Sequence, residues 1–138
     1  MSTDGREELR RRVRVDEAPP ADAAVVIRGG PDTRSLLSAH ARRLHRAFVL
    51  DGEPVFGVSV FVALDDLGPA SERGILSGKL RTYPSIYRCT AGELSDRGLM
   101  LLPTFVRPHY AIVLPDLGAV DALAAALGRL LPNPYAEA

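Results

Sequence analysis

The chain has 138 residues, of which 46% are hydrophobic and 25% are charged, and its 17 basic and 17 acidic side chains cancel. This size and composition fit one soluble domain with a single core, and the neutral balance argues against a protein that coats DNA. The sequence contains no run of 18 apolar residues, which a membrane span requires, and its start lacks the apolar segment of a signal peptide. We therefore expect no membrane partner and a cytoplasmic location. The single cysteine, Cys89, excludes a disulfide framework, and its apolar neighbours indicate a buried core residue.

The first part of the chain predicts an arm followed by a strand. Residues 1–22 are polar and rich in arginine, with Ala-Pro-Pro-Ala near their end. This composition predicts a flexible or docking arm ahead of one globular domain over residues 23–138. Residues 23–28 form a short apolar run that predicts a buried strand, closed by a turn at Gly29-Gly30-Pro31.

A helix is expected next, with Asp32 or Thr33 as its cap, and it extends to about Val49. Its apolar residues recur at the spacing of one buried helical stripe. That stripe is Leu37, Ala41, Leu44 and Phe48. Residues 55–63 follow and are apolar on both faces, which predicts the central strand of a sheet.

The middle of the chain carries weaker signals than its end. Leu67-Gly68-Pro69 starts a weak helical pattern that ends near Leu80, and residues 85–89 predict a short strand. Residues 99–104 and 109–114 predict two strands joined by a tight loop, which form a hairpin.

Two capping signals locate the remaining helices. Thr90 and Glu93 have the spacing of a capping box, so a helix is expected over residues 91–98, where a glycine stops it. Asp116 predicts the cap of the last helix. The order of elements predicts an α+β fold in a single domain, with a mixed or mainly antiparallel sheet of about five strands covered by helices.

The charges are unevenly distributed. Residues 28–46 hold five arginines and two histidines against one acid, residues 51–72 hold five acids and no base, and residues 73–107 hold six bases against two acids. Either the two basic segments form a patch for an anionic partner such as RNA, or they pair with the acidic segment between them.

Three side chains are candidates for catalysis. His109 begins the second strand of the hairpin beside Arg107, where an imidazole can titrate near neutral pH and transfer protons. Arg28 ends a buried strand before two glycines, where a guanidinium can hold a phosphate or a transition-state oxyanion. Ser59, in the central strand, is a candidate hydrogen-bonding group. Each also has a purely structural interpretation, which for Arg28 is an ion pair with Asp32.

Basic and aromatic residues alternate in the segment before Cys89, a composition typical of surfaces that stack on bases and bind phosphates, although a solvated strand edge gives the same pattern. The substrate-binding candidates are Arg81, Tyr87, Arg88 and Arg107. The sequence holds no metal-ligand motif, no Walker or Rossmann glycine loop and no Gly-x-Ser-x-Gly elbow, so we expect neither a metal nor a cofactor.

Residues 90–114 resemble the core of HicA-type mRNA-interferase toxins, in which a short helix ends in a glycine, a strand follows, and a histidine at the start of the next strand is catalytic. The resemblance implies a toxin of a toxin–antitoxin pair that cleaves RNA with His109. Arg107-Pro108 precedes this histidine, where the family usually has Gly-Ser. The whole chain also looks like small actinobacterial proteins with an Arg-Gly-Gly-Pro turn and a Pro-His-Tyr strand, a likeness that implies no activity.

A second resemblance competes with the first. Val-Val-Ile-Arg28-Gly, a strand serine at Ser59 and a late strand are similar to the Arg–Ser–Glu layout of ADP-ribosyltransferases. That likeness implies transfer from NAD, but His109 stands near the place of the glutamate that the layout requires.

Two classes of function follow. The leading hypothesis is a metal-independent endoribonuclease, in which His109 acts as general acid or base, Arg28 holds the scissile phosphate, and the 2′-hydroxyl of the RNA is the nucleophile. The alternative is a non-catalytic binding module, or a regulatory subunit of a small cognate protein partner.

Overall fold

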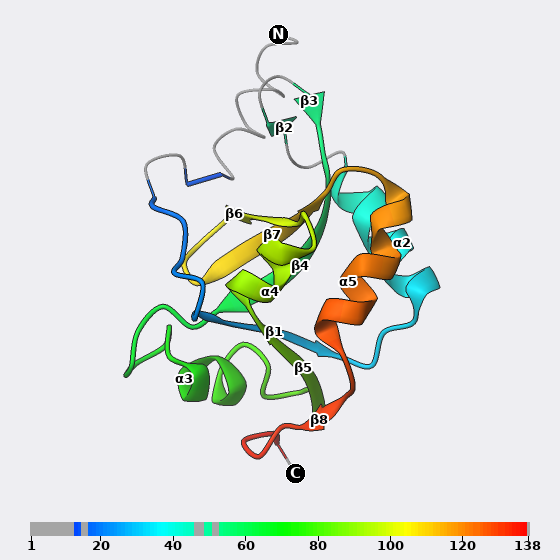
Figure 1. Cartoon of the computed structure of the whole chain (residues 1–138). Coiled ribbons are helices and arrows are strands. Elements are labelled where there is room, and N and C mark those ends of the chain that lie inside the picture. Colours follow the sequence, from blue (N-terminus) through cyan, green and yellow to red (C-terminus); the bar gives the residue numbers. More distant parts are fainter. Residues whose placement is uncertain (1–12, 15–16, 46–48, 51–52, 138) are drawn as a thin grey trace, which may run out of the picture.

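The structure is a computed structural model, and it describes residues 13–14, 17–45, 49–50 and 53–137. Its strands are β1 (Val25–Gly30), β2 (Val49–Leu50), β3 (Glu53–Pro54), β4 (Phe56–Val62), β5 (Ser85–Thr90), β6 (Met100–Pro103), β7 (His109–Leu114) and β8 (Leu131–Pro132). Its helices are α2 (Arg34–Leu44), α3 (Glu72–Ser77), α4 (Ala91–Asp96), the 3-10 helix η1 (Leu117–Ala119) and α5 (Val120–Leu127). Figure 1 shows the strands in the centre, with α2 and α5 to the right and α3 at the lower left.

The strands confirm the predicted α+β class. Six of them form one sheet in the order β6-β7-β4-β1-β5-β8, and the pairings are antiparallel. β2 and β3 form a separate two-stranded sheet. The sheet has one strand more than expected because β8, which has only two residues, is too short to leave a periodic signal.

The prediction of a turn at Gly29-Gly30 is wrong, because both glycines are the last residues of β1 and pair with Ile86 and Ser85. Packing explains them better than turn geometry. A Cβ on Gly29 would lie 2.5 Å from the Tyr83 ring, and one on Gly30 would lie 2.7 Å from Leu130. The strand therefore needs glycine where side chains cross it closely.

The predicted caps Thr33 and Thr90 are found, whereas Asp116 caps the 3-10 helix η1 that precedes the last helix, and the helix ends differ. Thr33 caps α2 by accepting the N–H of Leu36 at 3.1 Å. This helix ends at Leu44 instead of about Val49, which belongs to β2, and Phe48 lies outside the described residues. Thr90 and Asp116 accept backbone N–H groups at the starts of α4 and η1.

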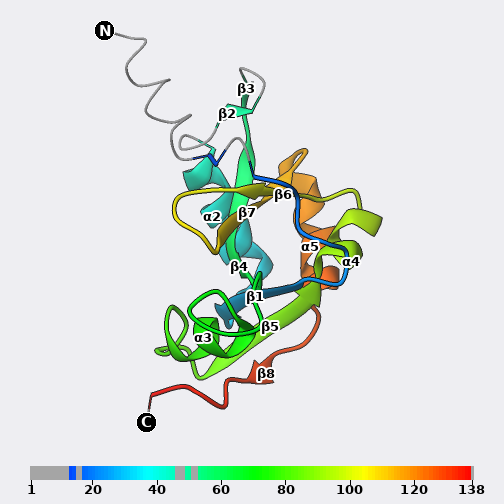
Figure 2. The same ribbon diagram turned by 90° about the vertical axis from the view of Figure 1, so that its left-hand side faces the viewer.

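Two apolar layers cover the two faces of the sheet. On one face α4 and α5 pack on a large core that includes Val26, Val60 and Tyr110. On the other face, residues of α3 and the loop after it pack on Ile27 and Ile86. Figure 2 shows α3 and the α4–α5 pair on opposite sides of the strands. Within the described residues, no helix is long and apolar enough to cross a membrane.

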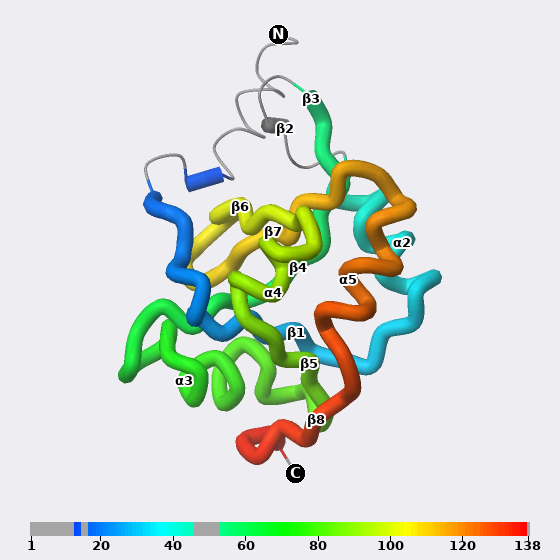
Figure 3. Tube along the Cα trace, viewed as in Figure 1, coloured from blue at the N-terminus to red at the C-terminus, as the bar shows by residue number. Residues whose placement is uncertain are grey.

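The chain after α5 returns to the sheet and fixes a loop. It adds β8 beside β5, as the tube in Figure 3 shows. Asn133 is 6% exposed, and its amide donates to the carbonyls of Leu76, Leu80 and Tyr83 at 3.0–3.1 Å. These bonds hold the segment of residues 78–83 against the sheet.

Two residues in the middle of the predicted arm, Val13 and Arg14, contact the hairpin. Val13 forms an antiparallel bridge with Thr104, and the Arg14 guanidinium donates to the carbonyls of Thr104 and His109 at 2.6 and 2.9 Å. The earlier part of the arm, residues 1–12, lies outside the described residues.

Candidate functional site

The sheet opens along one edge of β4. That strand pairs with β7 over six residues, but with β1 over only Val26↔Val62 and Ile27↔Phe61. The N–H of Ala63 donates to the carbonyl of Val25 at 2.8 Å. Backbone groups alternate between the two edges of a strand, so those of every second residue of β1, up to Gly29, point toward β4. A continued ladder would pair Gly29 with Ser59.

Two side chains replace the missing ladder bonds. His40 of α2 accepts the N–H of Ser59 through Nε2 at 3.1 Å. Arg28 donates from Nη1 to the carbonyl of Ser59 at 2.6 Å. Buried backbone groups need hydrogen-bond partners. The two side chains therefore bond the N–H and carbonyl of Ser59, which would pair with Gly29 in a continued ladder. The opening between β1 and β4 is therefore stabilised by specific side-chain hydrogen bonds.

Arg28 has a second bond in this opening. Its Nε donates to the Asp32 carboxylate at 2.7 Å, and both side chains are 13% exposed. The expected alternative of an Arg28–Asp32 ion pair is thus what the structure shows. No described residue bonds the remaining guanidinium nitrogen, Nη2.

A cavity of about 500 Å³ occupies the opening. It is lined by Arg28, Gly29, Gly30, Pro31, Asp32, His40, Arg43, Ser59, Phe61, Leu80 and Tyr83. The single acid in this lining is the one that Arg28 neutralises. The hydroxyl of Ser59 has no hydrogen-bond partner among the described residues, so the contacts of Ser59 with Arg28 and His40 are those of its backbone.

His40 lies between two donors. Its Nε2 accepts from Ser59, and Arg43 Nη2 lies 2.6 Å from its Nδ1. A neutral imidazole has one lone pair and an arginine cannot accept, so one of these contacts brings two donors together. Burial, followed by the charges of Arg28 and Arg43, lowers the His40 pKa from 6.5 to about 4. The cluster is thus short of one acceptor.

His109 lies one strand away, on the face of the sheet that Ile27 and Phe61 share, whereas strand alternation puts Arg28 on the other face. His109 is paired with Phe61 across β4 and β7, and the two rings meet edge to face with centroids 5.5 Å apart. His109 is not among the residues that line the cavity. The structure therefore brings Arg28 and Ser59 together and leaves His109 beyond Phe61.

The His109 ring is held by its own neighbours. Its Nδ1 lies 2.7 Å from the Thr104 hydroxyl, and the Phe105 ring is 4.9 Å away. Burial lowers the His109 pKa to about 4, a hydrogen bond to the Thr104 backbone opposes that change, and the charges of Arg14 and Lys79 add to it. No described residue bonds its Nε2.

His40 is the site residue that sequence reasoning missed. It is three residues after Leu37 and four before Leu44, two members of the buried stripe of α2. This spacing places it next to the stripe, which was the available signal. Helical spacing alone does not predict that the imidazole bonds the N–H of Ser59, because that contact depends on where β1 and β4 separate.

The expected substrate-binding residues do not share one surface. Tyr87 is 8% exposed and its hydroxyl exchanges hydrogen bonds with the backbone of Asp32. Arg88 points to the opposite face, as strand alternation requires. Arg81 and Arg107 lie together, at a second cavity of about 530 Å³.

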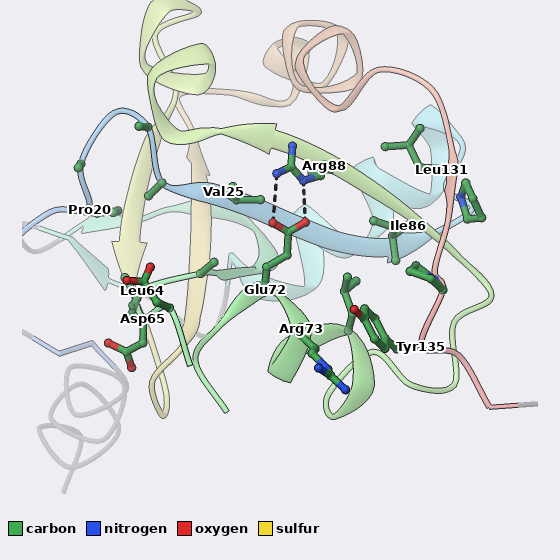
Figure 4. A pocket seen from close by; sticks show the side chains of 18 residues that line it. Pro20, Val25, Leu64, Asp65, Glu72, Arg73, Ile86, Arg88, Leu131 and Tyr135 are labelled. Atoms are coloured by element: carbon green, nitrogen blue, oxygen red, sulfur yellow. Dashed lines mark hydrogen bonds and ion pairs between the residues drawn. The ribbon is translucent and has the colours of Figure 1, made fainter. Parts of the chain in front are cut away.

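Arg88 borders a larger cavity, of about 930 Å³, shown in Figure 4. Its guanidinium donates twice to the Glu72 carboxylate, at 2.8 and 3.1 Å. Arg73 lies over the Tyr135 ring in the same cavity. Asp65, Asp66 and Glu72 also line this hollow, so it offers less to an anion than the cavity between β1 and β4.

Neither a metal centre nor a reactive thiol is seen in the described part of the chain. There, no group of three or more His, Cys, Asp or Glu side chains could hold a metal ion. Cys89 is 4% exposed, which confirms the expected core residue, and burial raises the pKa of its thiol to about 11.

Comparisons of the chain with family models, with curated proteins and with solved structures found no match. The fold and the site therefore rest on the residues themselves.

Proposed function

We propose that this protein is a binding module that holds a phosphate group of its ligand in the cavity between β1 and β4. One observation carries the proposal: the cluster around His40 has one donor more than it has acceptors. An oxyanion beside Arg43 and the imidazole would supply the missing acceptor.

The other polar groups of the cavity are suited to the same ligand. Arg28 keeps Nη2 free of described partners, and the Ser59 hydroxyl is also unbonded by them. The β1 ladder directs the N–H of Gly29 toward the opening. The carboxylate of Asp32 is already paired with Arg28, so it repels an anion weakly. Guanidinium and N–H groups that converge in this way are typical of phosphate sites.

The experiment is a phosphate titration followed by NMR of the histidine rings. A bound anion favours the imidazolium, so inorganic phosphate should raise the His40 pKa from about 4. Arg43→Ala should weaken this effect roughly tenfold, since a charge-assisted hydrogen bond is worth about 1.5–3 kcal/mol. Arg42→Ala is the matched control, because Arg42 is an exposed neighbour on α2 outside the cavity lining. An unchanged His40 pKa at saturating phosphate would overturn the proposal.

A metal-independent endoribonuclease is the second candidate, and the His109 geometry favours it. Thr104 holds Nδ1 at 2.7 Å, which leaves Nε2 without a described partner. In this reaction a base takes the proton of the RNA 2′-hydroxyl, the 2′-oxygen attacks phosphorus, and the 5′-oxygen leaves with a proton. His109→Ala that cleaves RNA as fast as the parent would remove this candidate. No observation favours ADP-ribosyl transfer, since β7 contains no glutamate.

A further inference from the structure

A second cationic cavity lies beside the first. It encloses about 530 Å³, and its charged lining residues are Lys79, Arg81 and Arg107, with no acid among the residues that line it. All three of these side chains belong to exposed residues. The cavity therefore presents positive charge to solvent.

The two cavities share one wall. In the segment of residues 78–83, Leu80 and Tyr83 line the first cavity, while Lys79 and Arg81 line the second. Asn133 holds this segment by donating to the carbonyls of Leu80 and Tyr83. The relative position of the two cavities is therefore fixed by the fold.

His109 connects the cavities on the other side. Its ring contacts Phe61, which lines the first cavity, and it follows Pro108, which lines the second. Lys79 contributes to the lowered pKa of His109, and His109 contributes to that of His40. A path across His109 thus joins two sets of cations.

The cations of the second cavity are available to a ligand. No described residue forms an ion pair with Lys79. Arg107 donates from both Nη atoms to Asp65 at 3.3 Å and lies 3.8 Å from Glu17, so it is the least available of the three. Arg81 contacts Glu137 at 3.5 Å, with both side chains about 60% exposed. Such exposed pairs contribute little, so a phosphate can replace the carboxylates.

An aromatic ring at the first cavity indicates which polyanion fits. Tyr83 is 41% exposed, and its ring lies over the backbone of Gly29. An exposed ring in a cationic groove can stack on a base only where the base is unpaired. This favours a single strand over a duplex.

We infer that the ligand is a single-stranded nucleic acid, which places one phosphate in the cavity at Arg43 and His40 and passes over His109 to a later phosphate at Lys79 and Arg81. The inference rests on the proposed function and names its ligand class. It also gives His109 a position beside the backbone of the bound strand.

The test compares labelled single-stranded RNA, single-stranded DNA and duplex RNA by fluorescence anisotropy over a range of salt concentrations. The single strands should bind more tightly than the duplex. The double variant Lys79→Glu/Arg81→Glu should bind the single strand at least roughly tenfold more weakly. The slope of log K against log salt concentration should also fall in magnitude by about 2. Arg97→Glu, at the end of α4 on the other side of the sheet, is the matched control and should bind as the parent does.

The phosphate titration separates the two proposals. In the double variant, inorganic phosphate should still raise the His40 pKa, which also shows that the variant is folded. If it does so while oligonucleotide affinity is unchanged, the nucleic-acid inference is overturned and the phosphate cavity stands. Tighter binding of the duplex would overturn it as well. Equal binding of RNA and DNA supports recognition of the shared backbone, and preference for RNA supports contact with the 2′-hydroxyl.

Discussion

Strand β4 has one edge paired along six residues of β7, and another paired with β1 over two residues. On the β7 edge, backbone satisfies backbone and small side chains close the surface, as where Gly57 faces Ala111. On the β1 edge, the backbone of Ser59 depends on Arg28 and His40.

This difference shows how the fold makes a polar cavity from ordinary elements. A complete ladder leaves neither space nor free donors between two strands. When the ladder stops early, charged side chains must enter to bond the exposed backbone groups, and they bring more donors than that backbone requires. The site is therefore a consequence of the opening, and the two edges of β4 should respond differently to substitution.

Arg28→Ala should give the largest effect. It removes the partner of the Ser59 carbonyl and leaves the Asp32 carboxylate 13% exposed without its cation. Breaking a buried pair in this way costs about 3–5 kcal/mol. Urea unfolding measures the change.

Arg34→Ala is the control for that loss. Arg34 also pairs with an aspartate, Asp121, at 2.9 Å, but the two side chains are 72% and 75% exposed. Removing an exposed pair should change the unfolding free energy by less than about 1 kcal/mol. Equal losses in the two variants would show that the opened edge does not depend on Arg28.

A glycine on each edge sharpens the comparison. A Cβ on Gly29 would lie 2.5 Å from the Tyr83 ring, so Gly29→Ala should cost about 1–3 kcal/mol by overpacking. A Cβ on Gly57 would lie 3.4 Å from that of Ala111, an ordinary contact. Gly57→Ala should therefore be neutral, or stabilise by up to about 1 kcal/mol through the unfolded chain.

Thermal and urea unfolding of the two glycine variants measure these costs. Phosphate binding provides a second readout, since Gly29→Ala displaces a ring that lines the cavity and Gly57→Ala does not. A Gly29 variant as stable as the Gly57 variant would mean that Tyr83 moves away freely, and the close approach would then carry no cost.

The elements with local signals could be predicted from the sequence. The apolar run of residues 55–63 and the caps at Thr33 and Thr90 depend on neighbours along the chain, and the structure contains them. The α+β class followed from their order. Of the three catalytic candidates, Arg28 and Ser59 lie together, because Arg28 donates to the Ser59 carbonyl. Their role in a functional site stays a prediction.

The remaining part of the site is non-local. Arg28 and His109 are apart because β4 lies between their strands, β1 and β7. The apolar pattern of each strand is the same whichever strands lie next to it, so the sequence did not predict this order. Gly29 shows the same problem, because a Gly-Gly-Pro sequence is typical of a turn, and here Gly29 allows the close approach of Tyr83. To predict the role of His40, one would need to know both where the β1–β4 ladder ends and that α2 packs across that point.

Acid should destabilise the protein through its two half-buried imidazoles. His40 and His109 each have a pKa lowered to about 4, against 6.5 for the free group, so the unfolded chain takes up protons first. Their contribution to stability is complete above about pH 6.5 and is lost as the pH falls toward 4. The free energy of unfolding from urea titrations at several pH values should show this slope. His40→Gln and His109→Gln should each reduce it by less than about 1.4 kcal/mol per pH unit, the limit for one proton.

The pH dependence of the unfolding free energy, measured at saturating phosphate, tests whether the anion binds at the β1 edge of β4. An anion at the opened edge raises the His40 pKa toward that of the unfolded chain, so the contribution of His40 to the slope should shrink while that of His109 remains. In His40→Gln, phosphate should then leave the slope unaltered. If phosphate flattens the slope of His40→Gln as strongly as that of the parent, the anion acts elsewhere and the acceptor-deficient cluster is not where it binds.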